Sequence, residues 1–206
     1  MAHFAVTTVN VNGVRAAARK GGMQWVGDQL RSGAVQVVCL QEVRATESQF
    51  VEVLDEQGLA DLHWAQDDSA RLGHSGVALL SVLPLSDIVT GIGPARFEGT
   101  GRWVQATVAS PAGPMTIASV YVFAGDVDKP VQQEKYAFLE AMTGWFTDAR
   151  ARAASGAGHS LVCGDFNVAH TAADGDVYID NVRRVASLLD SLPHAESAIF
   201  GAGSYS

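Results

Sequence analysis

Residues 161–171, LVCGDFNVAHT, begin with apolar side chains and then turn abruptly polar. The first three are typical of the end of an internal β-strand. Gly164 then frees the backbone, and a carboxylate, an amide and an imidazole follow at Asp165, Asn167 and His170. Open α/β sheets place ligand-handling groups at strand ends of this kind. The stretch therefore predicts one part of a functional site, which side chains from elsewhere in the chain must complete.

Short apolar segments recur along the rest of the chain, and helical patterns lie between some of them. Gly- and Pro-rich segments near the middle favour hairpins between antiparallel strands. Strands mixed with covering helices predict a layered α/β fold. Strands are expected at 4–9, 35–40, 76–81, 104–109, 115–122 and 161–163, and helices at 22–31 and 130–154. One buried face of the longer helix is expected to carry Tyr136, Leu139, Met142, Trp145 and Phe146.

The composition, 48% hydrophobic and 17% charged over 206 residues, is that of a globular protein, and we expect a single domain. No stretch approaches the roughly 18 apolar residues of a membrane span, and no secretory signal is expected. Cys39 and Cys163 each lie in an apolar run and are expected as buried thiols, which favours a cytoplasmic location. The net charge of −8 argues against general affinity for nucleic acids, but a local basic patch could still bind them.

Four predicted strands end in polar or aromatic side chains: Asn10, Glu42, Tyr121, and Asp165 with Asn167. Each of them alone is ordinarily a cap, a turn residue or a half-buried aromatic. If the strands lie in adjacent sheets, the five side chains converge. Glu42 could then bind a hard cation such as Mg²⁺, with Asn10 supporting it or its waters. Asp165 could act as a general base, Asn167 could orient water or phosphate, and Tyr121 could donate to an oxyanion, so the group suits phosphodiester hydrolysis.

Six motifs follow one another along the chain: VNVNGVRAAARKG, VVCLQEVRA, HSGVALLS, GTGRWVQATV, SVYVFAG and CGDFNVAHTAAD. Their order resembles that of the exonuclease III-type apurinic/apyrimidinic endonucleases of the endonuclease/exonuclease/phosphatase superfamily. The resemblance covers residues 3–174 and implies two packed mixed β-sheets flanked by helices, a four-layer sandwich. It further implies a monomer that needs Mg²⁺, with Mn²⁺ possible, and that cleaves double-stranded DNA 5′ to abasic sites, with 3′ to 5′ exonuclease activity at 3′ ends.

The resemblance also implies residue roles. Asn10 and Glu42 match the metal site, and Tyr121, Asp165 and Asn167 match the catalytic groups. Arg15 and Lys20 match positions that touch DNA phosphates, Arg102 lies in a Gly-Arg signature, and His74 stands where a tyrosine is frequent. The expected substrate-binding residues are Asn12, Arg15, Lys20, His74, Arg102 and His170.

The family pattern stops after about Asp174, so the domain of residues 1–206 is expected to be incomplete beyond that point. The Trp-rich strand and the C-terminal Asp-His of the family are absent from the sequence. We expect the native polypeptide to be longer by roughly 50 to 80 residues, in line with single-domain sizes, and to include that pair. Two other interpretations stay open: a non-catalytic relative that binds nucleic acid, and a superfamily phosphatase or phosphodiesterase on a substrate such as phosphoinositides or sphingomyelin.

Overall fold

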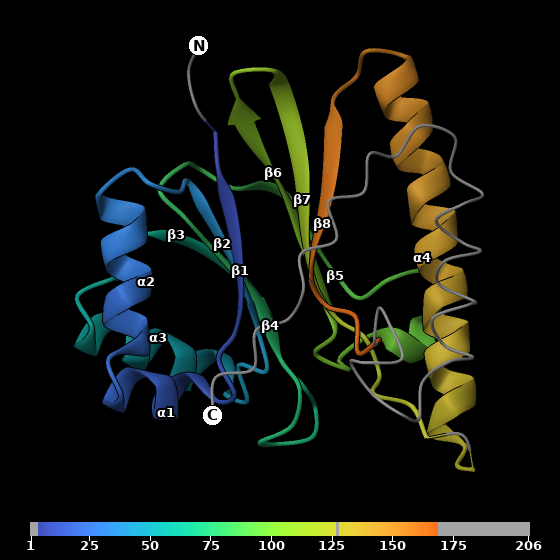
Figure 1. Cartoon of the computed structure of the whole chain (residues 1–206), viewed down its shortest axis with the longest axis horizontal. Helices are drawn as coiled ribbons and strands as arrows, with labels where there is room; N and C mark the ends of the chain where they lie inside the picture. Colours follow the sequence, from blue (N-terminus) through green and yellow to red (C-terminus); the bar gives the residue numbers. More distant parts are fainter. Residues whose placement is uncertain (1–3, 127, 169–206) are drawn as a thin grey trace.

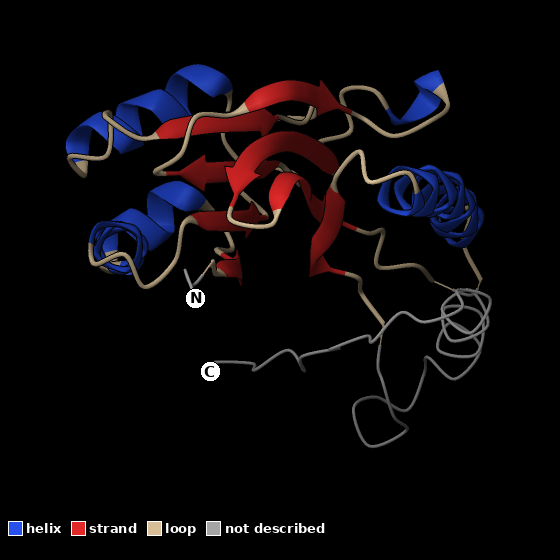
Figure 2. Cartoon of the chain, turned by 90° about the horizontal axis from the view of Figure 1, so that it is seen from above, coloured by secondary structure: helices blue, strands red, loops and turns tan. Residues whose placement is uncertain are grey.

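The computed structural model describes residues 4–126 and 128–168, which form two four-stranded sheets packed face to face between helices (Figures 1 and 2). The first sheet has the strand order β1-β2-β4-β3, in which β1 and β2 are parallel and the other neighbours antiparallel. Its strands are β1 (Val6–Asn10), β2 (Val37–Gln41), β3 (His63–Asp67) and β4 (Val77–Ser81).

The second sheet has the order β5-β6-β7-β8, antiparallel except for the parallel pair β7 and β8. That pairing sets Tyr121 opposite Asp165, so both side chains leave the sheet at the same end. The strands are β5 (Ser86–Thr90), β6 (Trp103–Ser110), β7 (Gly113–Tyr121) and β8 (His159–Asp165).

Helices cover the outer face of each sheet (Figure 2). The first sheet is covered by α1 (Val14–Arg19), α2 (Gly22–Arg31) and α3 (Glu47–Glu56), and the second by α4 (Val131–Ala154), with a short 3₁₀ turn η1 at Ala95–Phe97. Three apolar clusters fill the spaces between the four layers. The predicted four-layer α/β sandwich is therefore confirmed.

Strand β2 shows why a buried strand has no polar face here. Val38 and Leu40 pack toward the helices, whereas Val37 and Cys39 pack toward the second sheet, because successive side chains point to opposite sides. Both faces are covered, so all five residues of the strand are buried. The thiol of Cys39 is buried as expected, that of Cys163 is partly exposed, and both are free.

A buried polar contact joins the two sheets next to the site. Gln41 Nε2 donates to Ser119 Oγ at 3.0 Å, and that hydroxyl donates to the carbonyl oxygen of Leu40 at 3.0 Å. Thr8 Oγ1 donates to Gln41 Oε1 at 3.0 Å and so satisfies the other end of the amide. Losing one partner would leave a buried polar group unsatisfied at a cost of about 1–3 kcal/mol, so the contact fixes how the sheets are aligned.

Four elements were not expected from the sequence. The sequence of β3 is largely polar and all five residues of β5 are exposed, so neither shows the buried apolar run that identifies a strand. The helix α1 is only six residues long, too short for its sequence to show a helical pattern of apolar residues. Helix α3 begins with a capping box between Thr46 and Gln49, a signal that the sequence does carry. Within the described residues, no helix is long and apolar enough to cross a membrane.

Candidate active site

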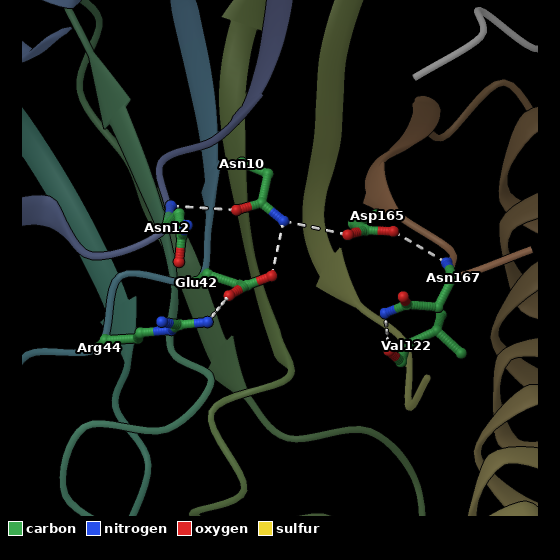
Figure 3. A network of polar contacts seen from close by, with 7 residues as sticks. All are labelled: Asn10, Asn12, Glu42, Arg44, Val122, Asp165 and Asn167. Atoms are coloured by element: carbon green, nitrogen blue, oxygen red, sulfur yellow. Dashed lines mark hydrogen bonds and ion pairs between the residues drawn. The ribbon is translucent and has the colours of Figure 1, made fainter. Parts of the chain in front are cut away.

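The polar side chains at the strand ends converge, as the sequence predicted (Figure 3). Asn10 is the last residue of β1, Glu42 follows β2, and Asp165 is the last residue of β8. Asn10 Nδ2 donates to Glu42 Oε1 at 2.9 Å and to Asp165 Oδ2 at 3.0 Å. A single amide therefore holds two carboxylates that come from different sheets.

The orientation of Asn10 is fixed by the turn that follows it. Its Oδ1 accepts a hydrogen bond from the backbone N–H of Asn12 at 3.1 Å, and Asn12 has a positive φ of 46°. The backbone N–H thus fixes the position of the oxygen, and the NH₂ group faces the carboxylates. In this orientation Asn10 supports Glu42 and Asp165, and its place in a metal site stays a prediction.

Glu42 lies in an unusual backbone conformation beside a guanidinium. Its φ is 52° and that of Arg44 is 51°, both in the left-handed region that non-glycine residues rarely adopt. The hydrogen bonds from the N–H groups of Val43 and Arg44 to the carbonyl oxygens of Gly76 and Ser75 hold this turn. Arg44 forms an ion pair with Glu42 Oε2, so each oxygen of the carboxylate has a partner. Sequence analysis missed Arg44, although it lies only two residues after Glu42.

Tyr121 lies against the same carboxylate. Burial, together with the negative charge of Glu42 and a hydrogen bond to it, raises the pKa of the Tyr121 hydroxyl, and the guanidinium of Arg102 partly opposes this. The phenol is therefore held in its protonated form, as an O–H that can donate to an anionic oxygen.

Arg102 packs on aromatic rings instead of extending into solvent. Its guanidinium lies 3.8 Å from the ring centroid of Phe123 and 5.0 Å from that of Tyr121, and Nη1 donates to the carbonyl oxygen of Tyr121 at 3.1 Å. Its backbone N–H donates to Asp67 Oδ2 at 3.0 Å. Asp67 is only 4% exposed, and burial raises its pKa to about 6. The buried carboxylate thus anchors the segment that carries Arg102.

The residues after β8 form a tight turn around Asp165. Asp165 Oδ1 accepts the backbone N–H of Asn167 at 2.9 Å, and Asn167 has a φ of 50°. The side-chain amide of Asn167 donates to the carbonyl oxygen of Val122 at 2.7 Å, which leaves Oδ1 as the atom that could accept from a water. Gly164, the residue of β8 just before Asp165, must be glycine because its φ is 154° and a Cβ there would lie 1.9 Å from the carbonyl oxygen of Val120.

A basic hollow of about 450 Å³ lies beside this cluster. Arg15 and Arg19 are exposed on one side of α1, four residues apart, and Arg44 extends into the hollow from the Glu42 turn. Asn12, whose backbone N–H bonds to Asn10, also lines the hollow, together with Gly13, Ala16 and Gly73. Three guanidinium groups beside two carboxylates suit a ligand that is anionic and extended.

The described residues can be tested for a fit to Mg²⁺. Between residues 4 and 168, apart from residue 127, no group of three or more His, Cys, Asp and Glu side chains could hold a metal ion. Mg²⁺ does not need such a cage, because it keeps several waters and is bound through one or two carboxylates plus substrate phosphates. Glu42 and Asp165, bridged by one amide, fit that requirement.

Three predicted site residues are not part of this cluster. His74 is exposed in the loop before β4, with its backbone N–H bonded to the carbonyl oxygen of Arg71. Lys20 is exposed at the end of α1, but it does not line the hollow, whose second α1 side chain is Arg19 instead. His170 lies outside the described residues. Contacts of these residues with a substrate stay predictions.

Known proteins are similar to this chain over most of its length. DNA repair nuclease APEX1 of Danio rerio is 28% identical over 176 residues, which are 84% of this chain and 52% of the relative. The chain thus spans about half the length of that protein. An AP endonuclease from Archaeoglobus fulgidus shares the fold with a TM-score of 0.69 at 20% identity, covering 92% of this chain and 70% of that one.

The 3′-5′ exonuclease NExo from Neisseria meningitidis gives a TM-score of 0.68 at 22% identity, covering 90% of this chain and 70% of that one. A Neisseria NExo described as a 3′ phosphatase, bound to a product DNA hairpin, gives the same values. At these identities the solved structures establish the fold alone. The sequence pattern of the Endonuclease/Exonuclease/phosphatase family, however, matches residues 7–182, which is most of the chain. The chain belongs to the endonuclease/exonuclease/phosphatase family.

Proposed function

We propose that this chain is a Mg²⁺-dependent DNA-repair nuclease that cleaves the phosphodiester bond 5′ to abasic sites and removes nucleotides from 3′ ends. One observation carries the proposal: the cluster of Asn10, Glu42 and Asp165 lies next to a hollow lined by three arginines. A cation bound by the carboxylates could bind the scissile phosphate. The guanidinium groups could bind the neighbouring phosphates of the strand. The zebrafish relative, described as a DNA repair nuclease, supports DNA as the substrate class.

The residues divide into three roles. Glu42 holds the cation, and Asn10 orients its carboxylate; a bound Mg²⁺ would supply charge stabilisation at the phosphate oxygens. Asp165 takes the proton of the attacking water. Its Oδ1 accepts one hydrogen bond from Asn167 and its Oδ2 accepts one from Asn10, so each oxygen keeps a second lone pair that can accept the proton. Tyr121 donates its O–H to the charge that develops on the phosphate.

The test is an endonuclease assay on a double-stranded oligonucleotide that contains one abasic-site analogue, with Mg²⁺, with Mn²⁺ and with EDTA. We expect cleavage 5′ to the lesion, and EDTA should abolish this cleavage. The same preparation is assayed on a nicked duplex for release of 3′ nucleotides, and on phosphoinositides and sphingomyelin. Activity confined to a lipid substrate would replace the proposal with a superfamily phosphodiesterase, and DNA binding without any cleavage would replace it with a non-catalytic relative.

A further inference from the structure

Lys135 is a charged side chain on the buried face of α4. Its exposed fraction is 0%. Its neighbours on the same helical face, at spacings of three, four and seven residues, are Phe138, Leu139 and Met142, which belong to the apolar cluster between α4 and the second sheet. A lysine at this position has the spacing of a core residue but not the chemistry of one.

The ammonium group of Lys135 joins two segments that lead to the site. Nζ donates to the carbonyl oxygen of Asn167 at 2.7 Å and to that of Ala124 at 3.2 Å. Ala124 follows β7, and Asn167 follows β8, so one side chain ties together the chain segments beyond Tyr121 and Asp165. Helix α4 lies alongside β8, which allows the contact (Figure 1).

Holding a cation here is costly. Desolvation lowers the pKa of Lys135 to about 8, and the negative charge of Asp165 offsets part of that change. An apolar side chain of similar length would fill the same space without the cost of burying a charge. Packing alone therefore does not account for the lysine, whereas its bonds to two backbone carbonyls do.

The carbonyl that Lys135 binds belongs to the residue that orients Asp165. The N–H of Asn167 donates to Asp165 Oδ1, and its side chain donates to the carbonyl oxygen of Val122 (Figure 3). With φ at 50°, Asn167 holds a conformation that asparagine tolerates but does not prefer. A third bond, from Lys135, restrains the turn from the side of α4.

We propose that Lys135 is a positioning residue whose ammonium fixes the Asp165–Asn167 turn and so orients the Asp165 carboxylate for catalysis. The catalytic part of this proposal rests on the proposed function, whereas the structural part does not. It also assigns α4 a role beyond covering the second sheet.

The test compares three variants of the full chain at a temperature where all are folded. Lys135→Met keeps the length of the side chain and removes the ammonium. Lys135→Arg restores donors that can reach both carbonyls. Met142→Ala is the matched control, because it removes buried apolar contacts from the same helical face about two turns away from Lys135.

Two measurements are made on each variant: amide hydrogen exchange of Asn167, and kcat with the dissociation constant for abasic DNA. Lys135→Met should speed exchange of the Asn167 N–H at least tenfold while the amides of β8 keep their protection. It should lower kcat roughly 10- to 100-fold, the usual cost of losing a group that orients a site residue, with the dissociation constant changed less than about threefold. Lys135→Arg should recover most of both losses.

Unchanged exchange in Lys135→Met, or an equal loss of kcat in Met142→Ala, would overturn the proposal. If the unmodified chain cleaves no abasic DNA, the proposed function fails, and the exchange of the Asn167 amide still decides whether Lys135 holds the turn.

Discussion

Asn10 and Asp165 are 155 positions apart in the chain, yet Asn10 Nδ2 donates to Asp165 Oδ2 at 3.0 Å. The two residues end strands of different sheets, so the bond crosses from one half of the sandwich to the other. The same amide donates to Glu42, which brings two carboxylates near each other. Two carboxylates held close together favour a divalent cation between them.

The first prediction concerns Asp165. Asp165→Asn keeps the shape of the side chain and removes the group that accepts a proton, so kcat for abasic DNA should fall by at least about 100-fold, the lower range for a general base. Binding of abasic DNA, measured by fluorescence anisotropy, should change little. Asp148→Asn, at an exposed position of α4, is the control. Collapse of binding in a folded Asp165→Asn protein would identify Asp165 as a substrate anchor instead.

The second prediction concerns Glu42. Glu42→Gln keeps the size of the side chain but removes the charge that would bind Mg²⁺ and that pairs with Arg44. Cleavage should fall by orders of magnitude at low Mg²⁺ and recover only in part at high Mg²⁺, while circular dichroism shows an unchanged fold. Glu52→Gln, on the exposed face of α3, is the matched control. Unmodified activity at saturating Mg²⁺ would remove Glu42 from the site.

Much of the fold could be predicted because its central strands are apolar on both faces. The strands β2, β4 and β6 have runs of buried residues, which the sequence shows directly. The strands β3 and β5 could not be recognised in the same way, because only Ala65 and Asp67 of β3 are buried and all five residues of β5 are exposed. An apolar run in the sequence indicates burial, and these two strands have little of it.

The carboxylates, Asn10 and Tyr121 could be predicted because all four lie at strand ends, where polar residues after apolar runs are conspicuous. Lys135 could not, because a lysine within an amphipathic helix is ordinarily taken for a solvated side chain. Its spacing from Phe138 and Met142 was the available signal. The orientation of Asn10, with its oxygen bonded to the backbone of Asn12, depends on a turn that spacing alone does not define.

The third prediction concerns the basic hollow. Because each phosphate contact contributes about 0.9 to the slope of log K against log salt, Arg15→Ala with Arg19→Ala should reduce that slope by roughly one to two units. Lys20→Ala should change it less, since Lys20 does not line the hollow. Arg31→Ala, whose guanidinium pairs with Asp61, is the control. An equal effect of Lys20→Ala would place the DNA along the end of α1 instead.

The last prediction concerns Asp67, whose carboxylate accepts the backbone N–H groups of Arg102 and Trp103 at 3.0 and 3.3 Å. Burial raises its pKa from 3.8 to about 6, so between these values the folded state binds more protons than the unfolded state. The free energy of unfolding should therefore fall as pH rises through this window, by up to about 3 kcal/mol from this group. Asp67→Asn keeps an oxygen acceptor and removes the titration. Its stability relative to the unmodified chain, from urea unfolding at pH 4 to 7, should rise with pH, whereas that of the Asp148→Asn control should not. A flat difference for Asp67→Asn would mean that the carboxyl titrates alike in the folded and unfolded states.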